Sequence, residues 1–447
     1  MFKETFLEKV FDFGRKIIPR PVFEFFQPWY HGLLALSGAV IFGWPSRKIK
    51  VIGITGTKGK STTVYLTTEF LEEAGSTGSP QAGYKVAAIG SLGYKIGDRV
   101  WPNNLKMTMP GRWKIQKFLA EAVKQGCQFA ILEITSEGIK QKRHLGVKFD
   151  AAVFTNLEKE HIESHGSFEK YYFEKQRLFK RTKKLHILNA DSEYVDLFSG
   201  FPAQKKIFYP VRGKDALRAL AASNGAGSFI FPFTTHLVGE FNKYNILAAA
   251  SVARAYGIND ETIQKALDKI KSIPGRLEFI EARQDFEVVV DYAHTPGSLE
   301  AVYKTLKPEA KKLICVLGAA GGGRDKWKRP VFGQIAAKFC DEMILTNEDP
   351  YDENPTQILL EIKSGIPNDK FQMTKEVIDR KEAIRGALTL AQKNDIVVIT
   401  GKGSETSMAV AKGKKIPWSD KDIVLDFFNS DSATPTYVGG GTFDEQK

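Results

Sequence analysis

Short, nearly continuous apolar runs recur along the chain from Lys50 onward, and amphipathic stretches with helical spacing lie between them. Runs without polar alternation are typical of strands that are buried on both faces of a parallel sheet. The pattern therefore predicts an α/β fold. The predicted strands are VIGIT (51–55), FAILEIT (129–135), AAVFTN (151–156), VVVDY (288–292), LICVLG (313–318), MILT (343–346) and IVVIT (396–400).

The predicted strand series is interrupted between about Asn189 and Pro274, and the segment IPGRLEF (Ile273–Phe279) has the composition of a turn between two bodies. A length of 447 residues suits roughly two to four domains. We expect a short apolar helical segment at 1–48, a first α/β domain at 49–275, a second at 276–428 and a disordered tail at 429–447.

Charge and cysteine usage narrow the class of protein. The 64 Lys and Arg residues exceed the 52 Asp and Glu residues by 12, which favours partners such as nucleotides, phosphorylated metabolites, nucleic acid or an anionic membrane. The cysteines Cys127, Cys315 and Cys340 are widely spaced and form no CxxC pair. We therefore expect no disulfide framework and no zinc site, and a reducing cytoplasm as the location.

The strongest local motif is GITGTKGKSTT (Gly53–Thr63), which follows a predicted strand and precedes a predicted helix. Backbone N–H groups of such a loop can hold a triphosphate, with Lys60 at the outer phosphates and Ser61 on Mg²⁺. The motif departs from the strict P-loop pattern, because Ile54 stands where the first glycine would fall. An ordinary Gly-rich turn is the alternative, and the order strand, GKST, helix favours phosphate binding.

Polar groups follow other predicted strands. Glu133 lies near the end of the second run. The loop Thr155–Gly166 holds Asn156 and His161 together with several glutamates. Ligands of open α/β sheets bind at the carboxyl ends of strands, so these groups could hold a metal or orient a phosphate. A helix cap or a solvated loop explains them equally well.

The second body repeats this arrangement. Asp291 and His294 follow one predicted strand, and the basic, Gly-rich segment Leu317–Pro330, which includes Arg324, follows the next. Such loops could face the phosphate loop across a shared nucleotide cleft. A flexible basic surface turn is the alternative.

Eight blocks in one order carry a family resemblance over about Lys50–Phe428: TGTKGKST, LEITSEG, TNLEKEHIESHGSFEKYYFEKQRLF, GEFNKYN, PGRLE, VDYAHTPGSLE, GGGRDKWKRP and GKGSE. The chain resembles the Mur ligases, and most of all those that add the third peptide residue of peptidoglycan. The resemblance implies a P-loop central ATPase domain with a mostly parallel sheet and a C-terminal Rossmann-like α/β domain. It also implies ATP and Mg²⁺, an acyl phosphate intermediate, and a cleft that becomes competent when the domains close.

The resemblance also implies residue roles. Lys60, Lys175, Asp291 and Arg324 match catalytic groups, and Lys175 matches a lysine that the family carbamylates. The implied nucleotide-binding residues are Gly56, Thr57, Lys58, Gly59, Lys60, Ser61, Thr62, Asn242, Arg276, Asp291, His294 and Arg324. The implied metal ligands are Ser61, Glu133, His161 and Lys175. The implied substrate-binding residues are Thr135, Ser136, Arg143, Thr155, Asn156, Asp349, Tyr351, Gly401 and Glu405.

Departures from the family pattern fall on the substrate side. The diaminopimelate-adding members have DNPR where this chain has EDPY (Glu348–Tyr351), so Tyr351 replaces an arginine and Asp349 favours an amine, as in lysine-type enzymes. Ser404 and Glu137 each replace a family histidine. Members of this branch start with a UDP-binding domain of about a hundred residues, whereas 48 residues precede the core here. The resemblance therefore does not choose the amino acid or decide whether the acceptor is UDP-linked or lipid-linked.

Three functions are compatible with these patterns. The first is a ligase that joins an amino acid to a UDP-linked muramyl peptide, as a cytoplasmic monomer without nucleic acid. The second keeps the chemistry with another acceptor, as in folylpolyglutamate or cyanophycin-type ligases. The third is a membrane-associated nucleotide switch, because the apolar residues 29–50 end in Arg47, Lys48 and Lys50. The apolar run is too short to span a bilayer, and a helix packed on the core is its favoured alternative.

Overall fold

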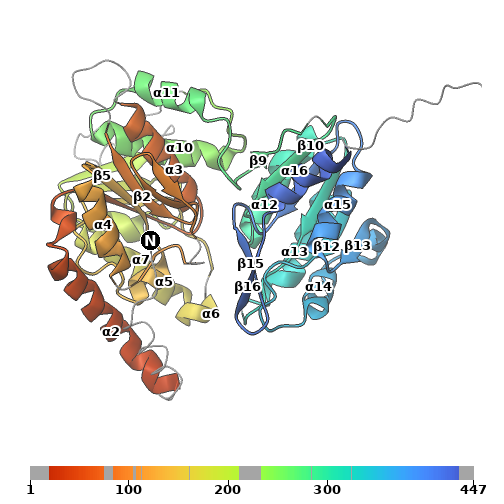
Figure 1. The fold of residues 1–447 in the computed structure, drawn as a ribbon, viewed down its shortest axis with the longest axis horizontal. Coiled ribbons are helices and arrows are strands. Elements are labelled where there is room, and N and C mark those ends of the chain that lie inside the picture. The colour runs from red at the N-terminus through yellow and green to blue at the C-terminus, as the bar shows by residue number, and fades with distance from the viewer. Residues whose placement is uncertain are drawn as a thin grey trace, which may run out of the picture. The chain divides into compact units, whose positions relative to one another are not determined.

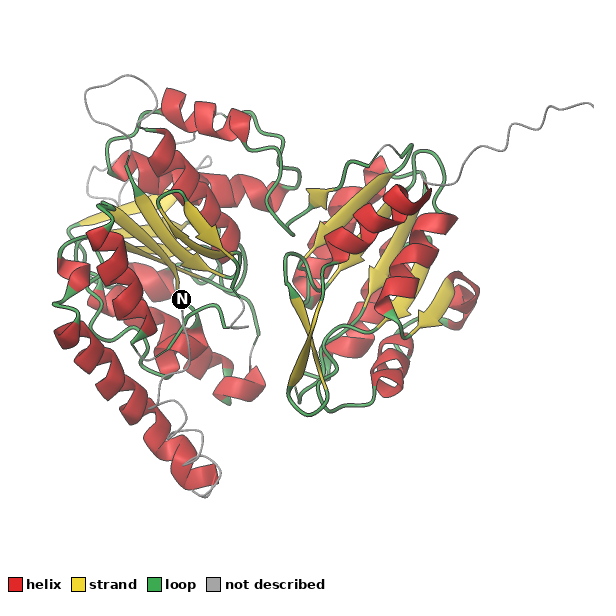
Figure 2. Ribbon diagram, viewed as in Figure 1, coloured by secondary structure: helices red, strands yellow, loops and turns green. Residues whose placement is uncertain are grey.

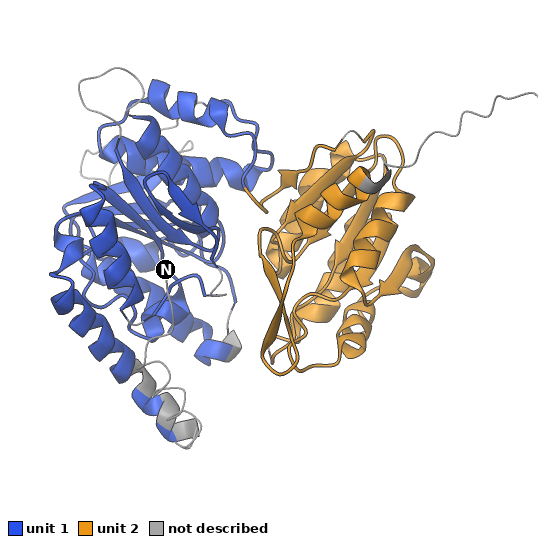
Figure 3. Cartoon of the chain, viewed as in Figure 1, with its two compact units in different colours: residues 1–273 blue, residues 274–447 orange. Residues whose placement is uncertain are grey.

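The computed structural model describes residues 20–74, 84–103, 107–111, 113–160, 162–210, 233–282, 284–323 and 325–431. The chain divides into two compact units, residues 1–273 and residues 274–447 (Figure 3). Two of the predicted site residues, His161 and Arg324, lie outside the described residues.

The first unit is built on an eight-stranded sheet (Figures 1 and 2). Its strands are β1 (Lys50–Thr55), β2 (Val86–Gly90), β3 (Gly93–Ile96), β4 (Arg99–Trp101), β5 (Phe129–Glu133), β6 (Ala151–Phe154), β7 (Leu185–Asn189) and β8 (Lys205–Tyr209). They lie in the order β4-β3-β2-β5-β1-β6-β7-β8. The strands from β2 to β8 in this order are parallel, and β3 and β4 extend one edge as antiparallel strands.

Helices cover both faces of this sheet, because alternate residues of its strands face opposite sides. Ile52 and Ile54 of β1 belong to the core under α3 and α10, whereas Val51 belongs to the core under α4 and α7. The helices are α3 (Lys60–Glu73), α4 (Lys114–Lys124), α5 (Ser136–Lys140), α6 (Ile162–His165), α7 (Phe168–Arg181), α8 (Asp196–Ser199), α10 (Glu240–Ala255) and α11 (Asp260–Lys269). The apolar runs thus lie in strands that are buried on both faces, as the sequence predicts.

The predicted break after Asn189 is partly wrong. Strand β8 lies within it and pairs with β7 in parallel register. Its sequence KKIFY is exposed or half-buried at the two lysines and buried only in its last three residues, because it is an edge strand. A run of three apolar residues is too short to be recognised as a buried strand.

The second unit contains a six-stranded sheet with the order β13-β12-β11-β14-β10-β9. Its strands are β9 (Glu278–Phe279), β10 (Glu287–Asp291), β11 (Leu313–Leu317), β12 (Glu342–Thr346), β13 (Thr374–Val377) and β14 (Ile396–Thr400), and a separate hairpin is formed by β15 (Ser407–Val410) and β16 (Lys414–Pro417). All neighbours in the sheet are parallel except β9 and β10. This is the expected Rossmann-like architecture.

Five helices flank the second sheet: α12 (Pro296–Leu306), α13 (Lys328–Phe339), α14 (Pro355–Lys363), α15 (Arg380–Leu390) and α16 (Asp420–Asp431). Helices α15 and α16 share a core with alternate residues of β10, β11 and β14, and the other three helices lie on the opposite face (Figure 1). The unit also contains two 3₁₀ turns, the three-residue η2 (Lys307–Glu309) and the six-residue η3 (Asn368–Met373). Residues 429–431 belong to α16 rather than to a tail, and residues 432–447 lie outside the described part of the chain.

Two cysteines of the second unit are paired, against the expectation from their spacing. Cys315 in β11 and Cys340 at the end of α13 form a disulfide, with their Cα atoms 6.1 Å apart. The cause is the β11-α13-β12 crossover, which returns the chain beside β11, where Asp341 N donates to Leu313 O. A separation of 25 residues hides this proximity in the sequence. Cys127 is buried and unpaired.

The N-terminal segment forms helix α2 (Arg20–Ile41), which the 3₁₀ turn η1 (Pro45–Arg47) connects to β1. One face of α2 packs on α4 through small residues: a Cβ at Gly38 would lie 2.9 Å from Trp113 Cδ1. Trp113 Nε1 also donates to Ser37 Oγ at 2.9 Å. Among the described residues, none of the helices combines the length and apolar character that crossing a membrane requires.

His144, in the turn after α5, makes the first unit sensitive to acid. Its side chain is 3% exposed, and burial, together with the charges of Arg181 and Arg177, lowers its pKa to about 3. In the unfolded chain the pKa is about 6.5. Below pH 6.5 the unfolded state therefore binds one more proton than the folded state, and the free energy of unfolding falls by about 1.4 kcal/mol per pH unit.

We expect the variant His144→Gln to lose about 2 kcal/mol less stability than the wild type between pH 6.5 and pH 4.5. Urea unfolding of both proteins at the two pH values measures the difference, in which the titration of the remaining groups cancels. Parallel losses in the two proteins would show that His144 does not carry this sensitivity.

Candidate active site

The Gly-rich loop connects β1 to α3 at the carboxyl edge of the parallel strands. Gly59 is in the left-handed region at φ 76°, and a Cβ there would overlap with the Asn245 side chain. A Cβ at Gly56 would overlap with the Thr155 hydroxyl. Both positions require glycine, and the loop ends at the N-terminus of a 14-residue helix whose first N–H groups suit an anion. Ser61 and Thr62 of this first turn are buried.

The loop after β6 holds the Gly-rich loop in place. Lys58 N donates to Asn156 Oδ1 at 2.8 Å, and Thr155 Oγ1 donates to Lys58 O at 2.7 Å. Thr57 N donates to Asn156 O at 2.9 Å, and Glu158 N to Thr57 Oγ1 at 2.9 Å. Thr155 and Asn156, predicted as substrate-binding residues, thus use their side chains to position the phosphate loop.

Two lysines contact this loop, and they differ in burial. Lys60 Nζ donates to Thr57 O at 2.6 Å, and its side chain is partly exposed. Lys175 of α7 is 2% exposed and donates to Gly56 O at 2.6 Å. Burial, together with the charge of Lys60, holds the pKa of Lys175 well below its usual value, against the opposing effect of Glu160 and Glu133. Lys175 is therefore more easily deprotonated than an exposed lysine.

Glu133 lies on β5 beside β1, in register with Ile54. Its side chain is 2% exposed, and Ser91 N donates to its Oε2 at 2.8 Å. A Cβ at Gly90 would lie 2.9 Å from the same oxygen, so the residue before Ser91 must be small for this approach. Ser91 follows β2, which the sequence patterns did not predict.

Helix α10 begins beside the phosphate loop. Asn245 lies against Gly59, and its Nδ2 donates to Asn242 Oδ1 at 3.2 Å. Asn242 in turn donates to Val238 O at 2.8 Å and is 3% exposed. Asn242, predicted as a nucleotide-binding residue, is thus connected to the phosphate loop through Asn245, which the sequence motifs did not single out.

The predicted substrate residues after β5 have protein partners. Thr135 caps α5 by accepting from Gly138 N at 3.1 Å, and Ser136 Oγ lies 3.1 Å from His165 Nε2. Arg143 donates to Met109 O at 2.6 Å.

Glu137, which replaces a family histidine, has its Oε1 3.1 Å from His165 Nε2. Burial alone would raise the pKa of Glu137, but hydrogen bonds from His165 and Ser164 outweigh it and lower the pKa to about 2. The carboxylate is therefore ionised at neutral pH and holds His165 beside α5.

In the second unit, Asp291 ends β10 and accepts hydrogen bonds from Leu277 N at 2.7 Å and Ala293 N at 2.6 Å. Burial raises its pKa, although Arg276 and these two N–H groups act in the opposite direction. Arg276 lies over the Tyr292 ring at 4.4 Å, and His294 Nδ1 lies 2.9 Å from Tyr292 O. The structure thus brings the predicted residues Arg276, Asp291 and His294 together around one strand end.

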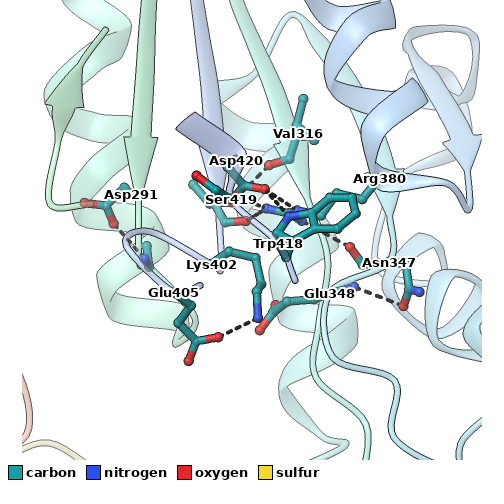
Figure 4. A network of polar contacts seen from close by, with 12 residues as sticks. Asp291, Val316, Asn347, Glu348, Arg380, Lys402, Glu405, Trp418, Ser419 and Asp420 are labelled. Atoms are coloured by element: carbon teal, nitrogen blue, oxygen red, sulfur yellow. Dashed lines mark hydrogen bonds and ion pairs between the residues drawn. The ribbon is translucent and has the colours of Figure 1, made fainter. Parts of the chain in front are cut away.

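A second polar cluster joins the EDPY and GKGSE motifs (Figure 4). Lys402 Nζ donates to Asp349 Oδ1 at 2.9 Å and pairs with Glu405 Oε2 at 2.5 Å. The amine that Asp349 binds in this structure is therefore Lys402, and Asp349 also accepts from Ala409 N at 2.7 Å. Although burial alone would lower the pKa of Lys402, Glu405 and Asp349 raise it. Lys402 is a cluster member that sequence reasoning missed.

Tyr351 and Gly401 lie at the edges of this cluster. Tyr351 is in the left-handed region at φ 52°, and its ring lies against Gly322, where a Cβ would be 2.9 Å from it. Gly401 has φ 107°, and a Cβ there would lie 2.8 Å from Glu348 Oε2. Among the described residues this Glu348 oxygen has no hydrogen-bond partner, and burial raises the Glu348 pKa against the charges of Lys402 and Arg380.

The oxygen donors of the first unit fit a magnesium ion. Ser61 offers a hydroxyl and Glu133 a carboxylate, which are the hard ligands that Mg²⁺ prefers. Within the described ranges no three His, Cys, Asp or Glu side chains are grouped to hold a metal by themselves. Further ligands would have to come from phosphate, water, His161 or a modified lysine.

A Gly-rich loop between a parallel strand and a helix, in a chain of two α/β units, defines the class of nucleotide-binding α/β enzymes. Residues 54–253 match the model of the Mur ligase middle domain, and residues 275–403 match that of the Mur ligase, glutamate ligase domain. The chain belongs to the Mur ligase family, whose members are ATP-dependent ligases that form carbon–nitrogen bonds.

Similar proteins cover most of the chain. It is 35% identical over 406 residues to UDP-N-acetylmuramoyl-L-alanyl-D-glutamate--2,6-diaminopimelate ligase 1 of Clostridium acetobutylicum, covering 88% of this chain and 81% of that protein. It is 34% identical over 416 residues to UDP-N-acetylmuramyl-tripeptide synthetase of Roseiflexus sp., covering 87% and 80%. A solved structure of a UDP-N-acetylmuramoyl-L-alanyl-D-glutamate--2,6-diaminopimelate ligase is 31% identical, with a TM-score of 0.55 over 86% of this chain and 79% of that chain.

Proposed function

We propose that the chain uses ATP to join an amino acid to the carboxylate of a UDP-N-acetylmuramoyl peptide, a precursor of peptidoglycan. The names of the similar proteins support this substrate class. The observation that carries the proposal is the burial of Lys175 against the phosphate loop, where its amine donates to the carbonyl of Gly56 and its pKa is lowered. This contact places the amine at the phosphate loop, and the lowered pKa favours the deprotonated form that modification needs.

Carbamylation requires a neutral amine. The amine nitrogen attacks the carbon of CO₂, and the product is a carbamate anion, –NH–COO⁻, with release of one proton. The lowered pKa of Lys175 favours the deprotonated amine, whose nitrogen lone pair makes this addition. The product carries a carboxylate in place of the amine, which would join Glu133 and Ser61 in an oxygen-rich set of metal ligands.

The ligation needs close approach of like charges. A carboxylate oxygen of the acceptor attacks the γ-phosphorus and ADP leaves; the amine of the amino acid then attacks the acyl carbon, and phosphate leaves with loss of a proton from nitrogen. Lys60 and the N–H groups of the loop would hold the phosphates in line. Ser61, Glu133, His161 and carbamylated Lys175 would hold Mg²⁺, which supplies charge neutralisation when bound. Asn242, Asp291, Arg276, His294 and Arg324 would hold the nucleotide.

The amino acid pocket is proposed at the cluster of Asp349, Tyr351, Gly401 and Glu405. Tyr351 offers no cation to a distal carboxylate, which supports an amino acid of the lysine type over diaminopimelate. A lipid-linked muramyl peptide is the second candidate acceptor, because helix α2 exposes an apolar face. The cytoplasmic location and the monomeric state stay predictions.

Release of ADP tests the proposal. UDP-linked and lipid-linked muramyl peptides are screened against lysine, diaminopimelate, glutamate and alanine in a coupled ADP assay. We expect release only when a carboxylate acceptor and an amino acid are both present, and we expect loss of release in Lys60→Ala but not in the exposed-lysine control Lys265→Ala. Release of ADP with neither substrate present would contradict a ligase.

A further inference from the structure

Helix α2 presents an apolar face that the described part of the chain leaves uncovered. Eight of its large apolar side chains are 40–69% exposed. They recur at spacings of three and four residues, which places them on one side of the helix. They are Val22, Phe25, Phe26, Trp29, Leu33, Leu36, Val40 and Ile41. Such a continuous exposed patch marks a surface for interaction.

The opposite face fixes the orientation of the helix. Ala35 and Ala39 are buried, and Gly38 approaches Trp113, the residue before α4, so closely that a Cβ would lie 2.9 Å from the indole ring. A Cβ at Gly146 would lie 2.7 Å from Ala39. Because small residues make this contact, α2 lies close to the first unit and its large side chains are directed away from it.

Positive charge accompanies the apolar face. Lys142 Nζ lies 3.4 Å from the centre of the Trp29 ring, and the exposed Arg47 and Lys48 follow the C-terminal end of the helix. Glu24 is the only acidic residue in the sequence of α2. Apolar and aromatic groups bordered by cations match the interface of a bilayer that contains anionic lipids.

Further basic residues lie on α5 and α7, and α5 directly precedes the turn that carries Lys142. This turn contacts α2 at Gly32, where a Cβ would lie 3.2 Å from Lys142 Cδ. At its start, Lys140 lines a cavity of about 570 Å³ together with Lys170, Arg177 and Lys180. Glu174 is the one acidic residue among the groups that line this cavity.

We propose that α2 docks the chain on a membrane surface that contains anionic lipids, with the apolar face in the interface and the neighbouring lysines and arginines on the headgroups. A spanning role does not fit, since none of the described helices could cross a membrane. A second copy of the chain is the competing occupant, because six of the eight residues follow a heptad spacing. The positions beside the seam of such a helix pair often carry Glu and Lys, whereas Arg20 and Glu24 are the only Lys, Arg, Asp or Glu residues in the sequence of α2.

Flotation of the full chain with vesicles tests this docking. The vesicles are phosphatidylcholine alone or with phosphatidylglycerol, at low and high salt. We expect binding to the anionic vesicles that weakens with salt, and a fall to about a tenth or less in Trp29→Ser/Leu33→Ser. The matched control Leu360→Ser/Ile378→Ser removes two exposed apolar side chains of the second unit and should bind as the wild type does. Melting temperatures show whether each variant is folded.

Three results would overturn the proposal. The first is that the wild type binds neither kind of vesicle. The second is that Trp29→Ser/Leu33→Ser binds anionic vesicles as well as the wild type does. The third is that the wild type sediments as a dimer and this variant as a monomer. The last result would assign the face to a contact between copies. Vesicle binding is measured without substrates, so its outcome is independent of the ligase activity.

Discussion

Arg380→Met is expected to lower the free energy of unfolding of the second unit by about 3–5 kcal/mol. The Arg380 side chain is fully buried, and it pairs with Asp420 through Nε to Oδ1 at 2.9 Å and Nη2 to Oδ2 at 2.7 Å (Figure 4). It also donates to Thr400 O at 2.8 Å and Asn347 O at 3.1 Å. Methionine fills much of the volume but leaves the Asp420 charge buried without its cation, which is the costly part.

Urea unfolding of the second unit, followed separately from the first, measures this loss. The double variant Arg380→Met/Asp420→Leu removes both charges and should recover part of the stability, because no buried charge then remains unpaired. As a control, Lys338→Met breaks the exposed pair with Glu300 and should change the stability by less than about 1 kcal/mol. A loss below about 1 kcal/mol in Arg380→Met would show that the buried pair is not needed.

Lys175→Ala is expected to lower the rate of ADP release by about 10²-fold or more, because it removes the proposed carbamate from the metal site. The variant should need more Mg²⁺ for its residual activity, a change that a purely structural role would not produce. Activity of the wild type should fall when dissolved CO₂ is removed and return when bicarbonate is added.

The matched control for this prediction is Lys180→Ala, which removes an exposed lysine from the same helix. It should keep wild-type activity and the wild-type dependence on Mg²⁺. Full activity in Lys175→Ala, or indifference of the wild type to CO₂, would contradict the proposed modification.

The sequence predicts the strands that consist mainly of large apolar residues, and it misses strands that consist of small or polar residues. The run LICVL predicts β11 because every side chain in it is buried. Strand β2 (VAAIG) consists mostly of small residues, which carry little hydrophobic signal, although it is buried along its whole length. The hairpin of β15 and β16 has an exposed second strand, KKIP. These strands form because they pair with neighbouring strands, and the local sequence pattern does not show that pairing.

The candidate site shows the same division. Gly56, Gly59 and Lys60 are predicted from local spacing, because a strand, a turn and a helix follow one another there. Tyr171 is not predicted as a site residue. Its hydroxyl contacts Thr57 Oγ1 at 3.0 Å, but the two residues are 114 positions apart in the sequence. Lys175 alone resembles an exposed helix lysine, and only the family resemblance selects it. The pairing of Cys315 with Cys340 likewise depends on a crossover that spacing does not reveal.

Helix α7 holds two consecutive residues of the phosphate loop through side chains one helical turn apart. Tyr171 and Lys175 are four residues apart, so they lie on the same side of the helix, one turn from each other. The first contacts the side chain of Thr57 and the second the carbonyl of Gly56. Inserting or deleting one residue between them would rotate one contact by about 100° away from the loop. In related sequences, the number of residues between these two positions should therefore be constant, whereas the residues on the exposed face of α7 can vary.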